Sequence, residues 1–223
     1  MTHYEKNFDE VLSRIEAVRL ETNEHQIIKI VAVSKYVGAE AIRDFYEVGQ
    51  RAFGENRVQD MKAKAEALED LPLEWHFIGR LQTNKINALL DISPALIQSC
   101  EDYKMAVEID KRAAAKGKKQ PILLQINSAR EESKAGIAPE KAVEEYLKIY
   151  EELDNVTLKG VMTIGAHTDD EVKIRESFET TFKIYDKLRD KGAKYCSMGM
   201  SNDFELAVRC GSNMLRLGSI LFK

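Results

Sequence analysis

Hydrophobic residues follow two different rhythms near the start of the chain. Between Phe8 and Val18 they recur at intervals of three and four with charged residues between them, which is typical of an amphipathic helix of about five turns. The stretch from Ile27 to Val33 is instead a short apolar run rich in β-branched residues. Such a run predicts a buried strand, which Ser34 and Lys35 close.

The same two signals alternate along the rest of the chain. Further strand-like runs lie at 52–54, 75–79, 96–99, 122–126, 158–164, 195–199 and 214–217. Helix-like segments lie between them, near 39–49, 56–70, 84–90, 102–116, 140–153, 171–191 and 203–210. Strand–helix alternation implies parallel strands joined by right-handed crossovers. Eight such units in 223 residues predict an α/β fold, the (β/α)8 TIM barrel, with the open doubly wound sheet as the competing fold.

The two ends of the chain complete this expectation. Only residues 219–223 follow the last expected strand, so we expect no final helix there. The extra N-terminal helix is predicted to fill the vacant place around the barrel. Because no Pro-, Gly- or Ser-rich linker interrupts the sequence, we predict a single domain spanning residues 1–223.

Composition excludes several classes of protein. The chain has 33 Lys plus Arg and 37 Asp plus Glu, a formal net charge of −4, which argues against a nucleic-acid binder with a basic face. No apolar run approaches the ~20 residues of a membrane span, and no secretory signal is visible, so we expect a cytoplasmic protein. The histidines and the three cysteines show no ligand or disulfide spacing, which predicts neither a metal site nor a disulfide. No pattern indicates a dimer, so a monomer is expected.

Lys35 is the first candidate for chemistry, because functional groups of such barrels lie at the carboxyl ends of the strands. A lysine that closes so apolar a strand is poorly placed for solvent. Burial favours the uncharged amine, which forms Schiff bases with carbonyl compounds. The alternative is a lysine that extends into solvent from the end of its strand.

Two glycine-containing turns follow the last two expected strands. Gly199-Met200-Ser201 opens the helix near Asp203, and Gly218-Ser219 combines an adaptable backbone with a hydroxyl. Because such turns offer free backbone N–H groups, the two together would cradle one phosphate. The alternative is that Ser201 or Asp203 only caps its helix and that Gly218 only punctuates a loop.

Three further polar residues lie within or directly after the expected strands. Arg216 is either part of an ion pair at the rim or a donor to a ligand. A carbonyl-reactive lysine, an arginine and a phosphate pocket on one rim suggest pyridoxal 5′-phosphate (PLP) as the ligand. His76 lies mid-strand among large apolar residues, which favours an interior histidine, and Asn56 is equally placed to cap the following helix.

At these residues the sequence resembles a known family. The segments are V-S-K at 33–35, F-G-E-N at 53–56, W-H-F-I-G-R-L-Q-T-N-K at 75–85, S-M-G-M-S-N-D at 197–203 and R-L-G-S at 216–219. They resemble those of the pyridoxal phosphate homeostasis proteins, the YggS/PROSC family, in the same order from about residue 27 to residue 222. Two departures are modest: Arg57 stands where an aromatic residue is common, and Ser219 stands where threonine is usual but keeps the hydroxyl.

The resemblance implies one barrel like the N-terminal domain of bacterial alanine racemase, with PLP held as a Schiff base on Lys35. Phosphate binding would fall to the two glycine turns, and Arg216 would face the pyridine nitrogen. Asn56 and His76 match motif positions around the cofactor. The implied cofactor-binding residues are Lys35, Asn56, His76, Ser201, Arg216, Gly218 and Ser219.

The implied function is intracellular PLP homeostasis and amino-acid/keto-acid balance without substantial catalytic turnover, so no catalytic residue is assigned. PLP-dependent apoenzymes are candidate partners. An always-cationic Arg216 would keep the pyridine nitrogen unprotonated and weaken the ring as an electron sink. Two alternatives stay open: a fold-type III PLP enzyme, either an amino-acid racemase or a decarboxylase, and a barrel that binds a phosphorylated sugar or nucleotide precursor without PLP.

Overall fold

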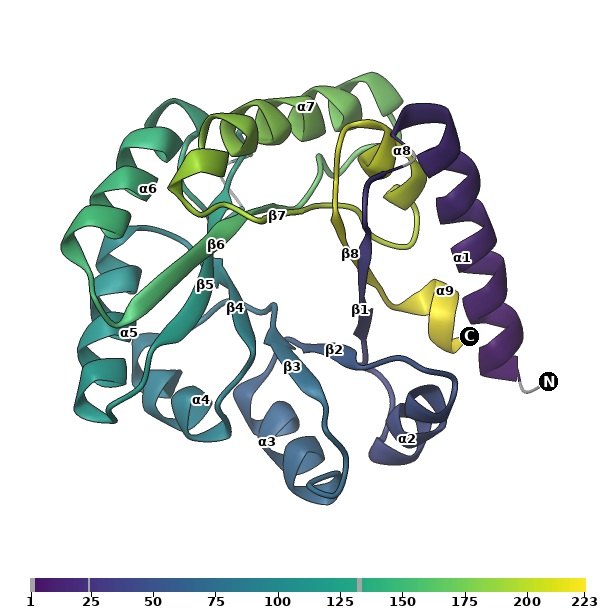
Figure 1. Ribbon diagram of the computed structural model, residues 1–223, viewed down its shortest axis with the longest axis horizontal. Helices are drawn as coiled ribbons and strands as arrows, with labels where there is room; N and C mark the ends of the chain where they lie inside the picture. The colour runs from purple at the N-terminus through teal and green to yellow at the C-terminus, as the bar shows by residue number, and fades with distance from the viewer. Residues whose placement is uncertain (1–2, 24, 132–133) are drawn as a thin grey trace.

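A closed barrel of parallel strands forms the centre of the computed structural model, which describes residues 3–23, 25–131 and 134–223 (Figure 1). Each strand pairs with the next in sequence, and β8 pairs with β1, so the sheet has no free edge. The strands are β1 (Lys29–Val33), β2 (Ala52–Glu55), β3 (Glu74–Phe77), β4 (Leu96–Cys100), β5 (Gln120–Ile126), β6 (Val156–Thr163), β7 (Tyr195–Ser197) and β8 (Met214–Leu217). The predicted α/β barrel is therefore confirmed, and the doubly wound sheet is not formed.

Helices surround the barrel, as the alternating pattern predicts (Figure 1). They are α1 (His3–Thr22), α2 (Ala39–Glu47), α3 (Val58–Ala67), α4 (Ile86–Ile92), α5 (Tyr103–Ala115), α6 (Pro139–Glu152), α7 (Glu171–Lys187), α8 (Phe204–Arg209) and α9 (Ser219–Phe222), with short 3-10 turns at Thr83–Lys85 and Arg189–Lys191. Within the described part of the chain no helix is long and apolar enough to cross a membrane. The three cysteines are buried and free, and no group of three metal-ligating side chains occurs among the described residues.

Two apolar layers explain why the strands are buried on both faces. Outward-facing strand residues pack with the helices in one continuous core. Inward-facing residues form a smaller cluster inside the barrel, made of Val31, Ala52, Leu96, Leu123, Met162 and Met214. Because this inner layer fills the barrel, ligands are confined to its ends, where the strands give way to loops.

The N-terminal helix fills the place that the last strand leaves vacant, as predicted. Helix α1 buries Val11, Ile15 and Val18 and lies beside α8 and α9 (Figure 1). The apolar face of α1 therefore covers the part of the barrel near β8 that a longer last helix would otherwise cover.

The expectation that no helix follows β8 is wrong. Residues 219–222 form the one-turn helix α9, in which the N–H groups of Leu221 and Phe222 both donate to the Gly218 carbonyl. Leu221 is fully buried, and the Phe222 ring packs against Phe45 at a centroid distance of 5.0 Å. The Asn7 amide of α1 donates to the Leu221 carbonyl at 3.1 Å. A segment of one turn is too short to show a helical periodicity in the sequence. Its stability comes instead from packing against helix α1.

Candidate functional site

A cavity of about 1320 Å³ opens at the carboxyl ends of the strands. Its wall is built from the loops that follow β1, β2, β3, β5, β6, β7 and β8. Most of the predicted site residues line it, namely Lys35, Asn56, Ser201, Arg216, Gly218 and Ser219. His76 is not among the lining residues. The closed barrel thus brings together residues that are far apart in the sequence.

Lys35 lies in the turn directly after β1 and is half-buried against the cavity. Its ammonium group lies 4.8 Å from the centre of the Tyr36 ring, a cation–π contact with a side chain that is 89% exposed. The lysine is therefore neither sealed in the core nor extended freely into solvent. Its amine is accessible from the cavity, as a Schiff-base lysine requires.

A buried ion pair fixes the backbone that carries Lys35. The Glu55 side chain is fully buried and accepts hydrogen bonds from Lys64 Nζ and from Ser34 Oγ, both at 2.6 Å. Lys64 also donates to the Ser34 carbonyl at 2.8 Å, and the Ser34 N–H donates to the Gly54 carbonyl at 3.0 Å. Sequence reasoning missed Lys64; the available signal was Glu55, an acid at a strand end that needs a cation if it is buried.

The two glycine turns converge, as predicted. Ser201 Oγ accepts hydrogen bonds from the backbone N–H groups of Gly218 at 3.2 Å and Ile220 at 3.4 Å. A Cβ on residue 218 would lie 3.3 Å from the Val33 carbonyl oxygen, so a side chain there would crowd β1. Ser201 does not cap helix α8, because its hydroxyl faces the other turn. Ser201 thus joins the two turns in one cluster of polar groups at the cavity, and phosphate binding by this cluster stays a prediction.

Asp203 also differs from a simple cap. It holds the N-cap position of α8 without a side-chain capping bond, and its carboxylate instead accepts from the Met200 N–H at 2.6 Å. Burial raises the pKa of Asp203, opposed by that N–H group and by Arg216. The bond between Asp203 and Met200 closes the turn and so fixes the position of Ser201.

Arg216 forms the floor of the cavity and is 5% exposed. Its guanidinium donates to Ser197 Oγ and to the Thr163 carbonyl, both at 2.7 Å. These recorded acceptors are neutral, so Arg216 is not held by a rim ion pair of the kind considered from the sequence. Burial lowers the pKa of Arg216 to about 10, opposed by Asp203, which leaves the group cationic at neutral pH.

The remaining two predicted residues lie at different depths. Asn56 is exposed at the mouth of the cavity, and the N-cap of α3 is Arg57, so Asn56 does not cap that helix. His76 lies inside the barrel, 2% exposed, with its Nδ1 atom 3.0 Å from Gln98 Nε2. The interior histidine inferred from the apolar neighbours is confirmed, whereas a cofactor-binding role for His76 stays a prediction.

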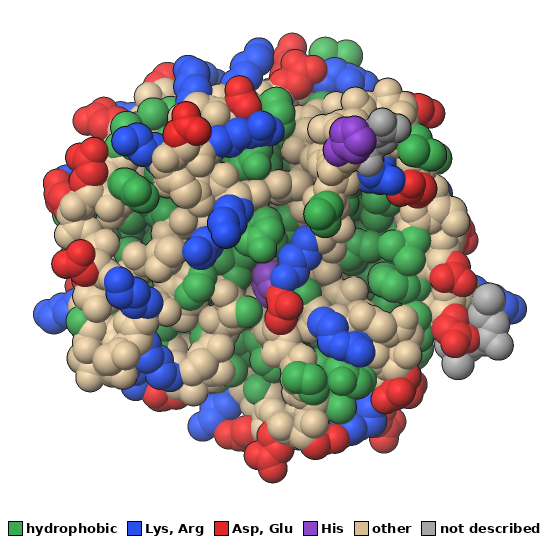
Figure 2. Space-filling model, in the orientation of Figure 1, with side chains coloured by type: hydrophobic (Ala, Val, Ile, Leu, Met, Phe, Trp, Pro, Cys, Tyr) green, Lys and Arg blue, Asp and Glu red, His purple; other side chains and the backbone are tan. Residues whose placement is uncertain are grey.

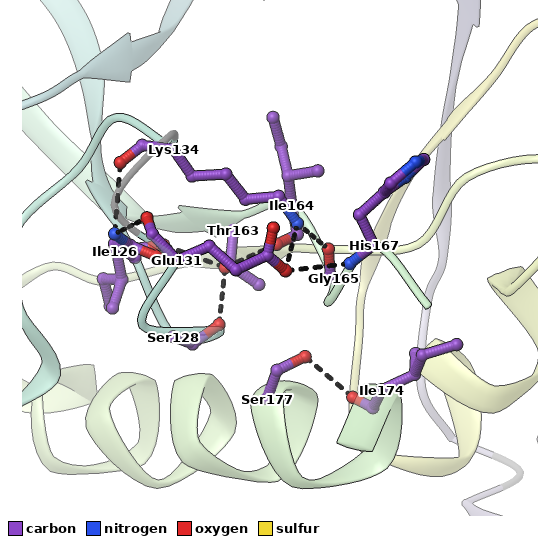
Figure 3. Close-up of polar contacts among 11 residues, drawn as sticks. Ile126, Ser128, Glu131, Lys134, Thr163, Ile164, Gly165, His167, Ile174 and Ser177 are labelled. Carbon is purple, nitrogen blue, oxygen red and sulfur yellow. Dashed lines mark hydrogen bonds and ion pairs between the residues drawn. The ribbon is translucent and has the colours of Figure 1, made fainter. Parts of the chain in front are cut away.

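The loops after β5 and β6 form one wall of the cavity (Figure 3). Lys134 Nζ donates to the Gly165 carbonyl at 2.6 Å and to Glu131 at 3.0 Å. The Glu131 carboxylate also accepts from the His167 N–H at 2.9 Å. The bonds to Gly165 and from His167 tie the two loops together, and the sequence offered no local signal for these two bonds because their partners lie more than 30 residues apart.

The fold and the site define a class: parallel barrels that carry a lysine after the first strand and two hydrogen-bonded polar turns after the last two. The family model described as "Alanine racemase, N-terminal domain" matches residues 7–223. A curated relative from Helicobacter pylori, named pyridoxal phosphate homeostasis protein, is 54% identical over 100% of both chains. The chain belongs to the pyridoxal phosphate homeostasis protein (YggS/PROSC) family.

Solved structures agree with this assignment. A protein from Bifidobacterium adolescentis described as unknown is 34% identical, with a TM-score of 0.93 over 98% of this chain and 94% of its own. PipY of Synechococcus elongatus, in a structure with PLP bound, is 31% identical, with a TM-score of 0.81 over 95% of this chain and 99% of its own.

Proposed function

We propose that this protein binds PLP at the carboxyl end of its barrel and acts in intracellular PLP homeostasis and amino-acid/keto-acid balance, without substantial catalytic turnover. In this proposal Lys35 holds PLP as a Schiff base, the turns of Ser201 and Gly218-Ser219 bind its phosphate, and Arg216 faces its pyridine nitrogen. The observation that carries the proposal is that an amine, a cation and an anion cradle line one cavity. The names of the relatives support the choice of ligand.

The donor groups of the cavity fit PLP. Two backbone N–H groups and one hydroxyl converge at residue 218, where a Cβ would crowd the Val33 carbonyl, and this arrangement suits a compact phosphate. Arg216 adds a fixed positive charge whose recorded partners are neutral. PLP carries an aldehyde for the Lys35 amine, a ring nitrogen for the Arg216 guanidinium and a phosphate for the two turns. All three protein groups line the same cavity.

The residues of this chain favour retention of the ligand over its use in catalysis. PLP, when bound, supplies an electron-withdrawing ring. Arg216 stays cationic at neutral pH, so it can donate a hydrogen bond to the ring nitrogen but does not transfer its proton, and the ring remains a weak electron sink. The buried Glu55–Lys64 pair holds the turn of Lys35 in place, which favours a reversible covalent bond at a fixed position.

Asn56 and His76 complete the proposed set. Asn56, exposed at the mouth, is proposed as a direct contact, whereas His76 is proposed to act through the residues between it and Arg216. PLP-dependent apoenzymes are the proposed recipients of the ligand, the protein is proposed to be monomeric, and the cytoplasm is its proposed location.

Borohydride reduction followed by peptide mass mapping tests the cofactor and the lysine together. The protein mixed with PLP should carry a pyridoxyl mass on the peptide that contains Lys35. Lys35→Ala should keep the fold, because the residue lies at the rim, and lose the label. Lys223→Ala, a change at another lysine that lines the cavity, should keep it. No label, or label spread over surface lysines, would contradict PLP binding and favour a barrel that binds a phosphorylated ligand non-covalently.

A racemisation assay tests the absence of turnover. The PLP-loaded protein is incubated with several amino acids one at a time, and the ratio of the two enantiomers is followed by chiral chromatography. We expect no change beyond experimental error. Sustained turnover of any one amino acid, lost in Lys35→Ala, would instead support the fold-type III enzyme.

A further inference from the structure

A row of polar side chains crosses the inside of the barrel beneath Arg216. Ser197 on β7, Gln98 on β4 and His76 on β3 are at most 2% exposed. The distances along the row are 2.7 Å from Arg216 Nη1 to Ser197 Oγ, 2.6 Å from Ser197 Oγ to Gln98 Oε1, and 3.0 Å from Gln98 Nε2 to His76 Nδ1. The apolar residues of the inner layer lie around this row and offer it no hydrogen-bond partners.

Arginine sets the direction of every bond in this row. A guanidinium can only donate, so Ser197 Oγ must accept from it and give its own proton to Gln98 Oε1. The Gln98 amide then presents its NH₂ group to His76. A donor in that position requires an unprotonated Nδ1, so the single proton of the neutral ring lies on Nε2.

The far end of the row agrees with this order. His76 Nε2 lies 3.8 Å from Glu74 Oε2, longer than a hydrogen bond, and it has no hydrogen-bond partner among the described residues. Glu74 in turn pairs with Lys29. An N–H on Nε2 therefore points towards a carboxylate, and every donor in the row points from the cation at Arg216 to the anion at Glu74. Aligned dipoles of this kind strengthen one another.

Charged side chains of both signs and a histidine lie together at the centre of the view down the barrel in Figure 2. The row thus joins a charged end of the barrel to the floor of the cavity at the other end. The reverse orientation of the Gln98 amide would place its NH₂ against the Ser197 hydroxyl. That hydroxyl would then receive two donors and leave its own buried proton without the Gln98 acceptor, which is costly.

We propose that Ser197, Gln98 and His76 are positioning residues that hold the Arg216 guanidinium in one orientation at the cavity floor, and that this one-way row keeps His76 in its neutral Nε2–H tautomer. The inference rests on the proposed function only in naming the pyridine nitrogen of PLP as the group that Arg216 faces. The row itself exists in the protein without a ligand. The orientation of Arg216 is fixed by two neutral acceptors, so the loss of Ser197 leaves the guanidinium held by the Thr163 carbonyl alone and allows it to rotate more readily.

Nuclear magnetic resonance of the ligand-free protein tests the tautomer directly. In protein labelled with ¹⁵N-histidine, the His76 signals are assigned by their absence in His76→Gln, and protonated and bare ring nitrogens are distinguished by their shifts. We expect the proton on Nε2. Gln98→Glu, which can only accept, should move the proton to Nδ1 or add a second one. A wild-type ring with its proton on Nδ1, or a folded Gln98→Glu protein with an unchanged tautomer, would overturn the proposal.

The rotation of the Arg216 guanidinium provides a second test of the proposal. Its first result comes from the wild-type protein and so does not depend on the stability of a variant. With ¹⁵N-arginine, the wild-type protein should show separate Nη1 and Nη2 signals, assigned by their loss in Arg216→Lys. Ser197→Ala should average them. Ser212→Ala removes another buried hydroxyl, which bonds only to backbone carbonyls, and should leave the Arg216 signals and the His76 tautomer unchanged. Averaged signals in the wild type would refute the positioning role.

These outcomes separate the two proposals. If the tautomer and the split arginine signals are found but PLP does not label Lys35, the positioning row stands and the proposed function fails. If PLP labels Lys35 while His76 carries its proton on Nδ1, the proposed function stands and the positioning row fails.

Discussion

The neutral state of His76 makes the stability of this protein depend on pH in a specific range. Burial lowers the pKa of His76 in the folded protein, with a further decrease from Lys29, while Glu74 opposes both. Gln98 adds to this effect by presenting a donor to the ring. In the unfolded chain the ring is exposed to water and titrates near its ordinary value of 6.5. As the pH falls, the unfolded state therefore takes up a proton before the folded state does.

The sign and the magnitude of the change in the free energy of unfolding with pH follow from this difference in bound protons. Below pH 6.5 the unfolded state binds more protons, so the free energy of unfolding decreases as the pH decreases and is regained above pH 6.5. One proton of difference gives a slope of about 1.4 kcal/mol per pH unit. Between about pH 7.5 and pH 5 the loss is at most about 2 kcal/mol, the limit in which the folded ring takes up no proton. Glu74 contributes mainly below this range, because its ordinary pKa is 4.5 and His76 and Lys29 lower it to about 2 in the folded protein.

Urea unfolding curves from pH 5 to pH 7.5, extrapolated linearly, measure this loss in the wild type and in His76→Gln. Glutamine keeps an acceptor for Gln98 and a donor towards Glu74 but does not titrate. The wild type should lose up to about 2 kcal/mol more than His76→Gln over the range, whatever their difference at neutral pH. His167→Gln, at an exposed histidine, should follow the wild type. Parallel curves for the wild type and His76→Gln would refute the reasoning.

Three further predictions concern the cavity wall. Glu55→Gln should lower the free energy of unfolding by about 3–5 kcal/mol, measured by chemical denaturation, because it leaves the partly buried Lys64 ammonium without its carboxylate partner. An unchanged unfolding midpoint would contradict the buried ion pair. Gly199→Ala should lower the melting temperature, since φ is +98° and the new Cβ would lie 2.6 Å from a side chain on α8, whereas Gly38→Ala, with open space around it, should not. Ser201→Ala should weaken PLP binding by roughly 1.5–3 kcal/mol, or about 10- to 100-fold in Kd by fluorescence titration; unchanged affinity would assign phosphate binding to the backbone alone.

The barrel could be predicted because its signal is repeated along the chain. Each strand is a short apolar run and each crossover is an amphipathic segment, so errors in single boundaries do not change the count of units. Helix α9 was missed for the opposite reason. One turn shows no period, and what stabilises it, the burial of Leu221 under α1, depends on residues at the other end of the chain.

The cavity was predictable in its lining but not in what holds the lining in place. Lys35, Ser201 and Arg216 follow strands, and all strand ends of a parallel barrel meet at one face, so position along the strand is enough. Ser197 and Gln98 are 99 residues apart and join only across the barrel. The one signal in the sequence was a polar residue at an inward position of an otherwise apolar strand, which must find a partner inside.

The neutral partners of Arg216 connect this interior to the proposed function. A carboxylate in contact with the guanidinium would cancel most of its field at the cavity floor, whereas a hydroxyl and a carbonyl orient the group and leave its net charge in place. The nearby acid, Asp203, has a raised pKa because of burial and uses its carboxylate on the Met200 N–H. Under the proposed function, this uncancelled charge attracts an anionic ligand and disfavours protonation of its ring nitrogen. The same arrangement that strengthens binding therefore weakens the electron sink, which favours a protein that holds PLP over one that uses it.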